Sequence, residues 1–303
     1  MAVEEAAARS LAQSGEVTAG RRTEAPAYGD TQRTSAPVRE AGAPQERAPR
    51  AWRMAGLLLP VAFLLVVEVL VRAQVLPDNL VPAPSEIAQA LWQLGGATLL
   101  KHIVQSTARV AAGFACGALF AVIVGAAMGL SRRLDAVLDP SFQALRAIPS
   151  LAWVPVLLLW MGIDEAPKIT LVAIGAFFPV HLSVLSGVRN VDRKLVELGA
   201  VYRLSSWRLF VRILLPAALP HIFTGLRTGL AVSWMFVVAA ELIAATRGLG
   251  YLLSDGRETG RPDIVFGAII LLGLLGKLTD SAMKALEAHV LSWRDTSVEG
   301  ART

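Results

Sequence analysis

Residues 110–131 read VAAGFACGALFAVIVGAAMGLS, and no charged side chain occurs between Arg109 and Arg132. A hydrocarbon layer of about 30 Å requires about 20 consecutive apolar residues in a helix, because backbone N–H and C=O groups in lipid have no water to bind. This stretch meets that requirement in length and in composition. It therefore predicts a helix that crosses a membrane.

Apolar stretches on both sides of this helix extend the prediction. Charged residues are also absent from residues 148–163 and from the stretch between Lys168 and Arg189. Three further stretches are apolar with isolated charges, namely residues 54–71, 220–245 and 264–286. We expect an all-α, polytopic membrane protein with about six transmembrane helices.

The composition agrees with lipid as the solvent. The chain is 54% hydrophobic and 17% charged, with a mean hydropathy of +0.53, whereas soluble domains carry about 25% charge. Its net charge of +5 comes from basic residues that gather in alternate loops. Such loops stay on the cytoplasmic side, so we expect both termini in the cytosol and no nucleic acid partner.

The two ends of the chain differ from its apolar middle. Residues 1–53 are rich in Ala, Glu, Arg, Pro, Ser and Thr without hydrophobic periodicity, which predicts a disordered cytosolic tail or, alternatively, a docking peptide. No apolar core of a secretory signal occurs within the first 30 residues or so. Residues 54–291 are expected to form the membrane domain, and residues 292–303 a cytosolic C-terminal tail.

Small residues and prolines predict special packing in two spans. In the third span, Pro149 and Pro155 each remove a helical hydrogen bond, which favours either a broken helix that lines a cavity or a simple kink. In the second span, small residues recur every fourth position and share one face that another helix can approach closely, for static packing or for a sliding contact. These residues are Gly113, Gly117, Ala121, Gly125 and Gly129.

Other segments leave alternatives open. Residues 85–101 repeat apolar residues at helical spacing, which favours a short amphipathic helix at the outer interface or an extension of the second span. Glu241 places a carboxylate at membrane depth, where it marks a translocation path or binds the backbone of the next loop. Glu68 and Arg227, near their own helix ends, are expected to be paired or to reach the interface.

Residues 191–220 form a basic segment between the fourth and fifth spans. Apolar residues repeat at helical spacing before and after Ser205 and Ser206, which are typical helix-capping residues. The pattern predicts two short amphipathic helices joined by a turn, with Pro216 and Pro220 ending the pattern before the fifth span. An apolar face with a basic rim outside the membrane suits a groove on a soluble partner.

This segment resembles the coupling motif of binding-protein-dependent transport permeases, whose consensus opens with Glu-Ala-Ala, places Gly in a turn and closes with Leu-Pro. Leu198 replaces the first Ala, and Arg203 stands where the turn glycine is expected. If that position has a positive φ, Arg203 carries a steric penalty of order 1 kcal/mol. Either the turn is built differently in this chain, or coupling to the ATPase is altered. The resemblance implies ATPase contacts through Glu197, Leu198, Gly199, Ala200, Arg203, Leu204, Ser205, Phe210, Leu215, Pro216 and Pro220.

Residues 80–294 as a whole resemble the nitrate, taurine and aliphatic-sulfonate branch of that family. The resembling blocks include "DPSFQALRAIPSLAWVPVLLLWMGI" at residues 139–163 and "AAELIAATRGLGYLL" at residues 239–253. The resemblance implies the type I fold of ATP-binding-cassette (ABC) importer permeases and a multi-pass position in the bacterial plasma (inner) membrane. It also implies a permease homodimer around a central path, two cytoplasmic ATP-binding subunits that use ATP and Mg, and an extracytoplasmic solute-binding protein.

The chain itself is expected to be a transporter and not an enzyme, with no catalytic, cofactor or metal site. The stretch "LLGKLT" around Lys277 lacks the first glycine and the Ser or Thr of a phosphate-binding loop, and Cys116 is the single cysteine. The resemblance implies a small solute, such as an aliphatic sulfonate, taurine, nitrate or a similar small anion, moved by alternating access. Candidate path residues are Pro149, Ser150, Trp153, Ser233, Trp234 and Glu241.

The alternative is a secondary transporter driven by an ion gradient. Such a transporter needs carboxylates inside the membrane as coupling sites, and the candidates are Glu68 and Glu241. No inverted repeat is evident in the sequence. The importer therefore remains the favoured interpretation.

Overall fold

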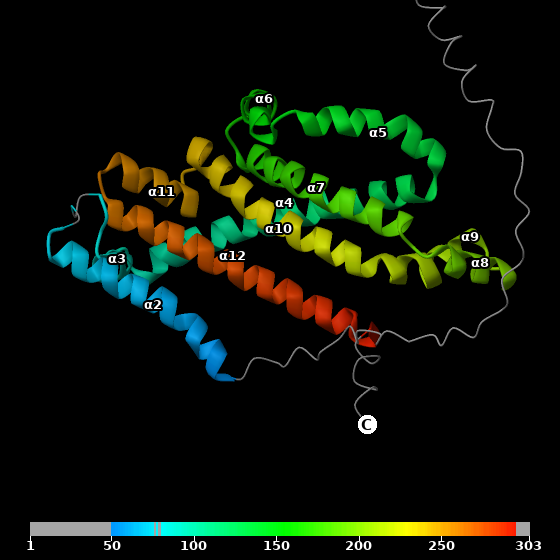
Figure 1. Ribbon diagram of the computed structural model, residues 1–303. Helices are drawn as coiled ribbons and strands as arrows, with labels where there is room; N and C mark the ends of the chain where they lie inside the picture. The colour runs from blue at the N-terminus through cyan, green and yellow to red at the C-terminus, as the bar shows by residue number, and fades with distance from the viewer. Residues whose placement is uncertain (1–49, 76, 78–79, 295–303) are drawn as a thin grey trace, which may run out of the picture. The chain divides into compact units, whose positions relative to one another are not determined.

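The computed structural model describes residues 50–75, 77 and 80–294, and all regular elements in these ranges are helical (Figure 1). Residues 1–49 of the predicted N-terminal tail and residues 295–303 of the predicted C-terminal tail lie outside the described ranges. The described residues from Ala55 onward form one compact unit.

Long helices alternate with short ones along the chain. Among the described residues, four stretches are long and apolar enough to cross a membrane, namely α4, α7, residues 210–244 and α12, and the bent pair of α5 and α6 makes a fifth if the two count as one span. Helix α2, with 23 residues, covers the first predicted span. The all-α polytopic prediction is confirmed. The elements are α2 (Arg50–Arg72), α3 (Pro84–Gln93), α4 (Gly96–Leu130), α5 (Arg132–Ala147), the 3-10 turn η1 (Ser150–Ala152), α6 (Trp153–Met161), α7 (Glu165–Arg189), α8 (Arg193–Val201), α9 (Ser206–Leu209), the π-helical turn η2 (Phe210–Leu214), α10 (Leu215–Ala244), α11 (Leu249–Glu258), α12 (Pro262–Val290) and the 3-10 turn η3 (Ser292–Arg294).

Helices α4 and α7 pack closely through the predicted small-residue face. A Cβ atom at Gly113 would lie 2.6 Å from Cβ of Val172, and one at Gly129 would lie 2.8 Å from Cβ of Val188. At Gly117 an added Cβ would meet the backbone of Ala173. Real Cβ atoms do not approach other atoms this closely, so only glycine lets the two helices come together here. The predicted close-packing surface is confirmed.

Helix α7 lies at the centre of the bundle. Half of its most apolar window is buried, compared with 17% for α12. Its side chains Leu171 and Val172 pack in one apolar cluster with residues of α4, α6 and α10, and Val180 and Val184 pack in a second cluster with α4 and α10. The core is therefore formed by α4, α7 and α10, and α12 presents most of its surface outward.

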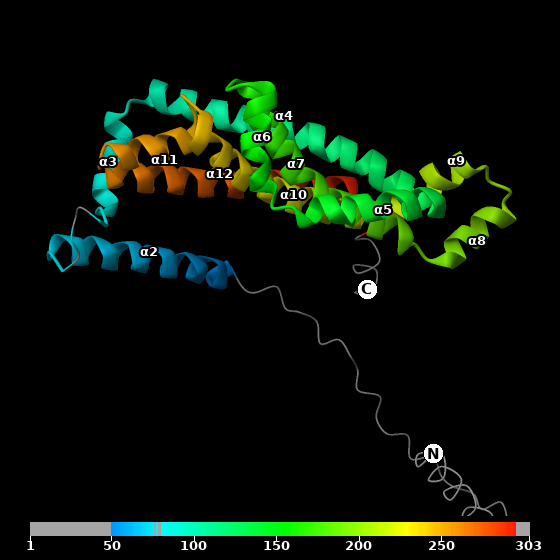
Figure 2. The same ribbon diagram turned by 90° about the horizontal axis from the view of Figure 1, so that it is seen from above.

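Residues 148–163 do not form one continuous helix. Helix α5 ends at Ala147, Ile148 is extended (φ −74°, ψ 124°), and α6 has only nine residues, about 14 Å at the helical rise. The two helices meet at an angle of 79°, and α6 crosses the long helices (Figure 2). The break follows from Pro149, which disfavours the helical conformation in the residue before it. Of the two alternatives for this segment, the broken helix is confirmed.

Pro216 and Pro220 do not end a helix before the fifth span, contrary to the expectation from sequence. The helix runs through both prolines to Ala244. Before them, Leu215 donates its N–H to the carbonyl of Phe210, a bond of the wider π type. A π turn shifts the hydrogen-bond ladder by one residue just ahead of Pro216, so the missing proline donor falls where the ladder is already rearranged.

Residues 85–101 divide between the two alternatives given for them. Helix α3 is a separate short helix that buries Ile87 and Ala90. Gly95 takes a positive φ of 81° and interrupts the helix, because glycine adopts this conformation at little steric cost. Residues 96–101 then belong to the long helix α4.

Candidate coupling segment and membrane cavity

Helix α8 ends in a left-handed turn centred on Arg203. Arg203 has a φ of 49°, and the N–H of Leu204 donates to the carbonyl of Gly199 at 3.1 Å. This six-to-one hydrogen bond around a left-handed residue is the Schellman ending of a helix, which glycine usually occupies. The turn therefore has the backbone of a glycine turn, and Arg203 carries the steric penalty described above.

Gly199 fixes how α8 lies against the following helix. A Cβ at this position would clash with Cδ1 of Leu209 and would lie 3.1 Å from Cδ1 of Ile213. Because position 199 has no side chain, the leucine and isoleucine of the next helical segment pack directly against the α8 backbone. Helix α8 confirms the first of the two short helices predicted for this segment, whereas the second, α9, has only four residues and continues through η2 into α10.

The far side of α8 and its turn exposes an apolar surface. Leu198 is 51% exposed, Val201 78% and Tyr202 72%. Exposed Glu197, Arg203 and Arg208 lie in the same segment. Exposed aromatic and aliphatic side chains with charges around them are typical of protein interfaces. We call Leu198, Val201 and Tyr202 the coupling surface.

The other predicted coupling residues lie behind this surface. Ser205 precedes α9, and its carbonyl accepts the N–H of Leu209 at 2.8 Å. Phe210 begins the π turn, and Leu215 packs on the cluster formed by α4, α7 and α10. Pro216 and Pro220 are half-buried within α10. Ala200 lies within α8, and its side chain is outside the described part.

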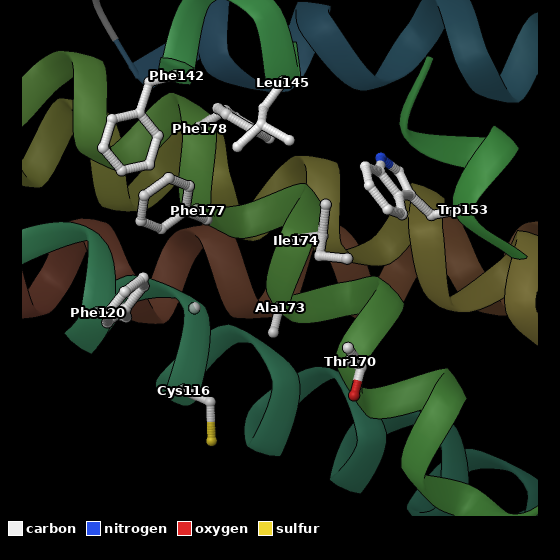
Figure 3. Close-up of a pocket in the computed structure, with 11 residues that line it drawn as sticks. Cys116, Phe120, Phe142, Leu145, Trp153, Thr170, Ala173, Ile174, Phe177 and Phe178 are labelled. Carbon is white, nitrogen blue, oxygen red and sulfur yellow. The ribbon is translucent and has the colours of Figure 1, made fainter. Parts of the chain in front are cut away.

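The break between α5 and α6 covers an apolar cavity of about 370 Å³, shown in Figure 3. Trp153, one of the candidate path residues, lines it. Pro149 and Ser150 lie in the break itself, where the carbonyl of Pro149 accepts the N–H of Ala152 at 2.8 Å. The rest of the lining comes from α4, α5 and α7 and consists of Cys116, Gly117, Phe120, Phe142, Leu145, Thr170, Ala173, Ile174, Phe177 and Phe178. Such walls offer almost no polar group to a dissolved anion.

Ser233 and Trp234, two further path candidates, are buried in α10. The hydroxyl of Ser233 donates to the carbonyl of Gly229 at 2.8 Å, within the same helix. The indole N–H of Trp234 donates to Oγ1 of Thr279 at 2.9 Å and so ties α10 to α12. Trp153 packs against the same apolar cluster as Trp234. Two of the six candidates thus share one cluster.

Glu241 is buried and fully partnered within the chain. Its carboxylate accepts hydrogen bonds from Oγ of Ser106 at 2.8 and 2.9 Å, from Nη1 of Arg109 at 2.7 Å and from the N–H of Gly250 at 2.8 Å. The last of these is the loop-backbone contact that sequence reasoning offered as one alternative. Glu68 pairs with Arg72 and Arg227 with Asp280, as expected for them.

Sequence reasoning missed Arg109 and Glu165 as functional candidates. Arg109 accounts for three ion-pair or hydrogen-bond links, to Glu165, to Glu241 and to the carbonyl of Arg247. Arg109 served in the sequence only as the boundary of a charge-free stretch, and Glu165 lies two residues after the end of another. A charged residue at the end of a span can anchor the helix at the membrane interface or form a buried ion pair. Only the distance to charged residues on other helices distinguishes these two roles.

Comparison with family models assigns most of the membrane domain. Residues 117–292 match the model described as "Binding-protein-dependent transport system inner membrane component". The described fold also resembles the MetNI methionine ABC transporter in an inward facing conformation, with a TM-score of 0.58 and 18% identity, over 64% of this chain and 97% of that chain.

Individual relatives match over most of the chain. It is 39% identical over 248 residues to a Bacillus subtilis (strain 168) protein named "Putative aliphatic sulfonates transport permease protein", covering 82% of this chain and 90% of the relative. It is 35% identical to the taurine transport system permease protein of Escherichia coli (strain K12), covering 73% and 82%. It is 34% identical to a bicarbonate transport system permease protein of Synechococcus elongatus, covering 64% and 70%.

Proposed function

The chain belongs to the family of binding-protein-dependent transport system inner membrane components, in the branch of the sulfonate and taurine permeases, and from this membership we propose that it carries a small anion across the plasma membrane. As an ABC importer permease it is a multi-pass inner membrane protein, and such permeases are not themselves enzymes. We propose that ATP, with Mg, is used by separate cytoplasmic subunits and that an extracytoplasmic protein delivers the solute.

The chemistry shared by the relatives supports an anionic substrate. Their names refer to aliphatic sulfonates, taurine and bicarbonate. Each of these solutes is small and carries a negative group. An aliphatic sulfonate or taurine is the substrate we favour, because the relatives named for them share higher identity and coverage than the bicarbonate permease does.

The coupling surface is the observation that carries the ATPase assignment. Helix α8 lies at the end of the bundle opposite to α3 and α11 (Figures 1 and 2). Leu198, Val201 and Tyr202 are largely exposed. At 51–78% exposure, their apolar side chains have no adequate partner within the described part of the chain. A groove on a soluble ATP-binding subunit would bury them and place basic Arg203 and Arg208 at its rim.

The apolar cavity favours a path formed between two copies of the chain. Moving an anion into walls without polar partners is strongly unfavourable, and the cavity lining is nearly all apolar. The polar path candidates Ser233, Trp234 and Glu241 have hydrogen-bond partners inside one chain. We therefore propose a homodimer with a central path, which alternates between outward and inward access as the ATP-binding subunits close and open.

An ion-coupled secondary transporter has no observation in its favour. Its coupling carboxylates would be Glu68 and Glu241. Glu68 binds Arg72 and Ser85, and Glu241 binds Ser106, Arg109 and the N–H of Gly250. A proton or sodium ion would have to displace these partners.

The proposal is tested with the double variant Val201→Asp plus Tyr202→Asp. Two carboxylates on the coupling surface must be desolvated in an apolar groove, so we expect at least a tenfold or so weaker association with the ATP-binding subunit. Association is measured by co-purification, and uptake of taurine and ethanesulfonate by the reconstituted transporter.

The matched control is Val75→Asp plus Leu80→Asp, which places the same charges on exposed positions in the connection between α2 and α3. We expect this control to keep the ATP-binding subunit bound. Unchanged co-purification of the coupling-surface variant would refute the assignment of that surface. Uptake of neither sulfonate-bearing solute by the intact complex would refute the substrate class.

A further inference from the structure

Four charged side chains form a row where α4, α7 and the end of α10 meet. Nε and Nη2 of Arg109 donate to the two carboxylate oxygens of Glu165 at 2.6 and 2.7 Å. Nη1 of Arg109 donates to Glu241 at 2.7 Å and to the carbonyl of Arg247 at 2.6 Å. Lys168 extends the row on the other side, with Nζ 3.4 Å from Glu165. The order of charges is therefore plus, minus, plus and minus, from Lys168 to Glu241.

The two carboxylates of this row differ in how firmly they are held. The Glu241 side chain is 0% exposed and binds Ser106 and the N–H of Gly250 in addition to Arg109. The Glu165 side chain is 48% exposed, and its described polar contacts are with Arg109 and Lys168 alone. The contact of Arg109 with Glu241 is thus built into the core, whereas its contact with Glu165 can reach water.

Lys168 is poorly partnered in the arrangement described. Its side chain is only 6% exposed, and the contact with Glu165 at 3.4 Å is the single polar contact that its ammonium makes among the described residues. A buried ammonium is stabilised by a close counter-ion. If Glu165 leaves Arg109 and moves fully to Lys168, the ammonium gains that counter-ion.

Opening the bond between Arg109 and Glu165 therefore leaves no charge alone. Breaking a buried ion pair is expensive mainly because one partner remains uncompensated. Here the split produces two neutral pairs, Arg109 with Glu241 and Lys168 with Glu165. The arrangement makes this contact strong when closed and inexpensive to open.

The chain around Glu165 has room to move. Gly162 takes a φ of 77° and has no atom within 4 Å of an added Cβ, and Ile163 is 74% exposed. Glu165 is the first residue of α7. The tight seam with α4 begins one turn later, where Gly113 approaches Ile169 and Val172. The first turn of α7 can therefore separate from α4 without disturbing the seam.

We propose that Arg109, Glu165 and Lys168 form an ion-pair latch that holds the first turn of α7 against α4 and opens during the transport cycle. The three are positioning residues: they act through α7, which lines the apolar cavity from Thr170 onward. When the latch opens, Glu165 changes partner from Arg109 to Lys168. This inference rests on the proposed ATP-driven cycle.

The test measures amide hydrogen exchange of residues 168–171, whose N–H groups bond the carbonyls of the first turn of α7, in the full chain assembled with its ATP-binding subunits in lipid nanodiscs. Exchange is compared without nucleotide and after trapping with ATP and vanadate. We expect about tenfold faster exchange in the trapped state of the wild-type protein, because local opening exposes these amides. Glu165→Gln should exchange quickly in both states. Lys168→Met keeps the Arg109 bond but removes the second partner, so it should lose most of the increase.

Two variants serve as controls. Lys168→Arg keeps a cation at this position and should restore the increase, which a merely structural role of Lys168 does not predict. Asp164→Asn removes the neighbouring exposed carboxylate and should behave as the wild type does. Equal exchange in the two states of the wild type, or an unchanged increase in Lys168→Met, would overturn the latch. Failure of vanadate to trap nucleotide in the wild-type complex would count against the proposed function instead.

Discussion

Arg203 illustrates how a departure from a motif acts through the backbone. The left-handed turn at the end of α8 is preserved, as its φ of 49° and the bond from Leu204 to Gly199 show. The backbone therefore keeps the glycine-type turn, and Arg203 carries the steric penalty of a Cβ atom at positive φ. Its guanidinium then lies beside the coupling surface, where a glycine would contribute no charge. The substitution thus exchanges turn stability for a basic group at the proposed interface.

Replacing this arginine separates the two effects. We expect Arg203→Gly to stabilise α8 and its turn by about 1 kcal/mol, because glycine adopts positive φ without a Cβ clash. The same variant should weaken association with the ATP-binding subunit, since a basic rim group is lost. Thermal unfolding of the purified permease and co-purification of the subunit measure the two quantities. A lower unfolding temperature for Arg203→Gly would contradict the strain argument.

At the scale of elements, the seam between α4 and α7 determines where the rest of the bundle can lie. The glycines of α4 bring the two backbones close enough that side chains of α7 fill the space directly. Helix α10 then packs against both, and the break between α5 and α6 folds over the outer side of α7. Because the glycines have no side chains, the two helix backbones come into close contact. This close contact strengthens the dispersion attraction along a long interface.

Identical substitutions at two glycines test the seam. A Cβ at Gly117 would meet the backbone of Ala173, whereas Gly276 of α12 has open space around it. We expect Gly117→Ala to destabilise the protein by about 1–3 kcal/mol through overpacking. Gly276→Ala should be neutral or stabilising by up to about 1 kcal/mol, from helix propensity alone. Unfolding in detergent measures both, and equal effects would show that the seam is not tight.

At the scale of the whole molecule, the number of crossings depends on the bent pair of α5 and α6. If that pair is one crossing and α2 another, the chain crosses six times, and the basic loops lead us to expect the coupling surface on the cytosolic side. If α5 and α6 together did not cross the membrane, the connection between α6 and α7 would lie on the cytosolic side. The direction of every later helix follows from this one element.

Cysteine accessibility decides between these topologies. In a Cys116→Ala background, we expect Asp164→Cys to react with a membrane-impermeant maleimide added outside intact spheroplasts, because residues 162–164 connect α6 and α7 on the outer face. Tyr202→Cys should react only after the membrane is opened, since basic loops remain in the cytosol. Labelling of both positions from the same side would contradict the six-crossing arrangement.

The sequence by itself determined the helical class and the positions of the long apolar helices, because lipid imposes a length and an apolar composition that can be read from consecutive residues. It also indicated the candidate coupling segment, whose helical periodicity and capping residues are local properties. The small-residue face of α4 was predictable for the same reason, since a repeat of four residues places its members on one side of a helix.

Only the tertiary structure decided which polar residues meet. Arg109, Glu165 and Glu241 are separated by 56 and 76 positions along the chain, as their numbers show, and no local pattern links them. The shape of the third span also became clear only from the tertiary structure. Pro149 indicates a disruption of the helix, but the 79° bend depends on what α5 and α6 pack against. The continuation of α10 through Pro216 and Pro220 depended on a π turn. Hydrogen bonds and ion pairs between distant helices are set by three-dimensional distance, whereas lipid-length spans are set by the order of residues alone.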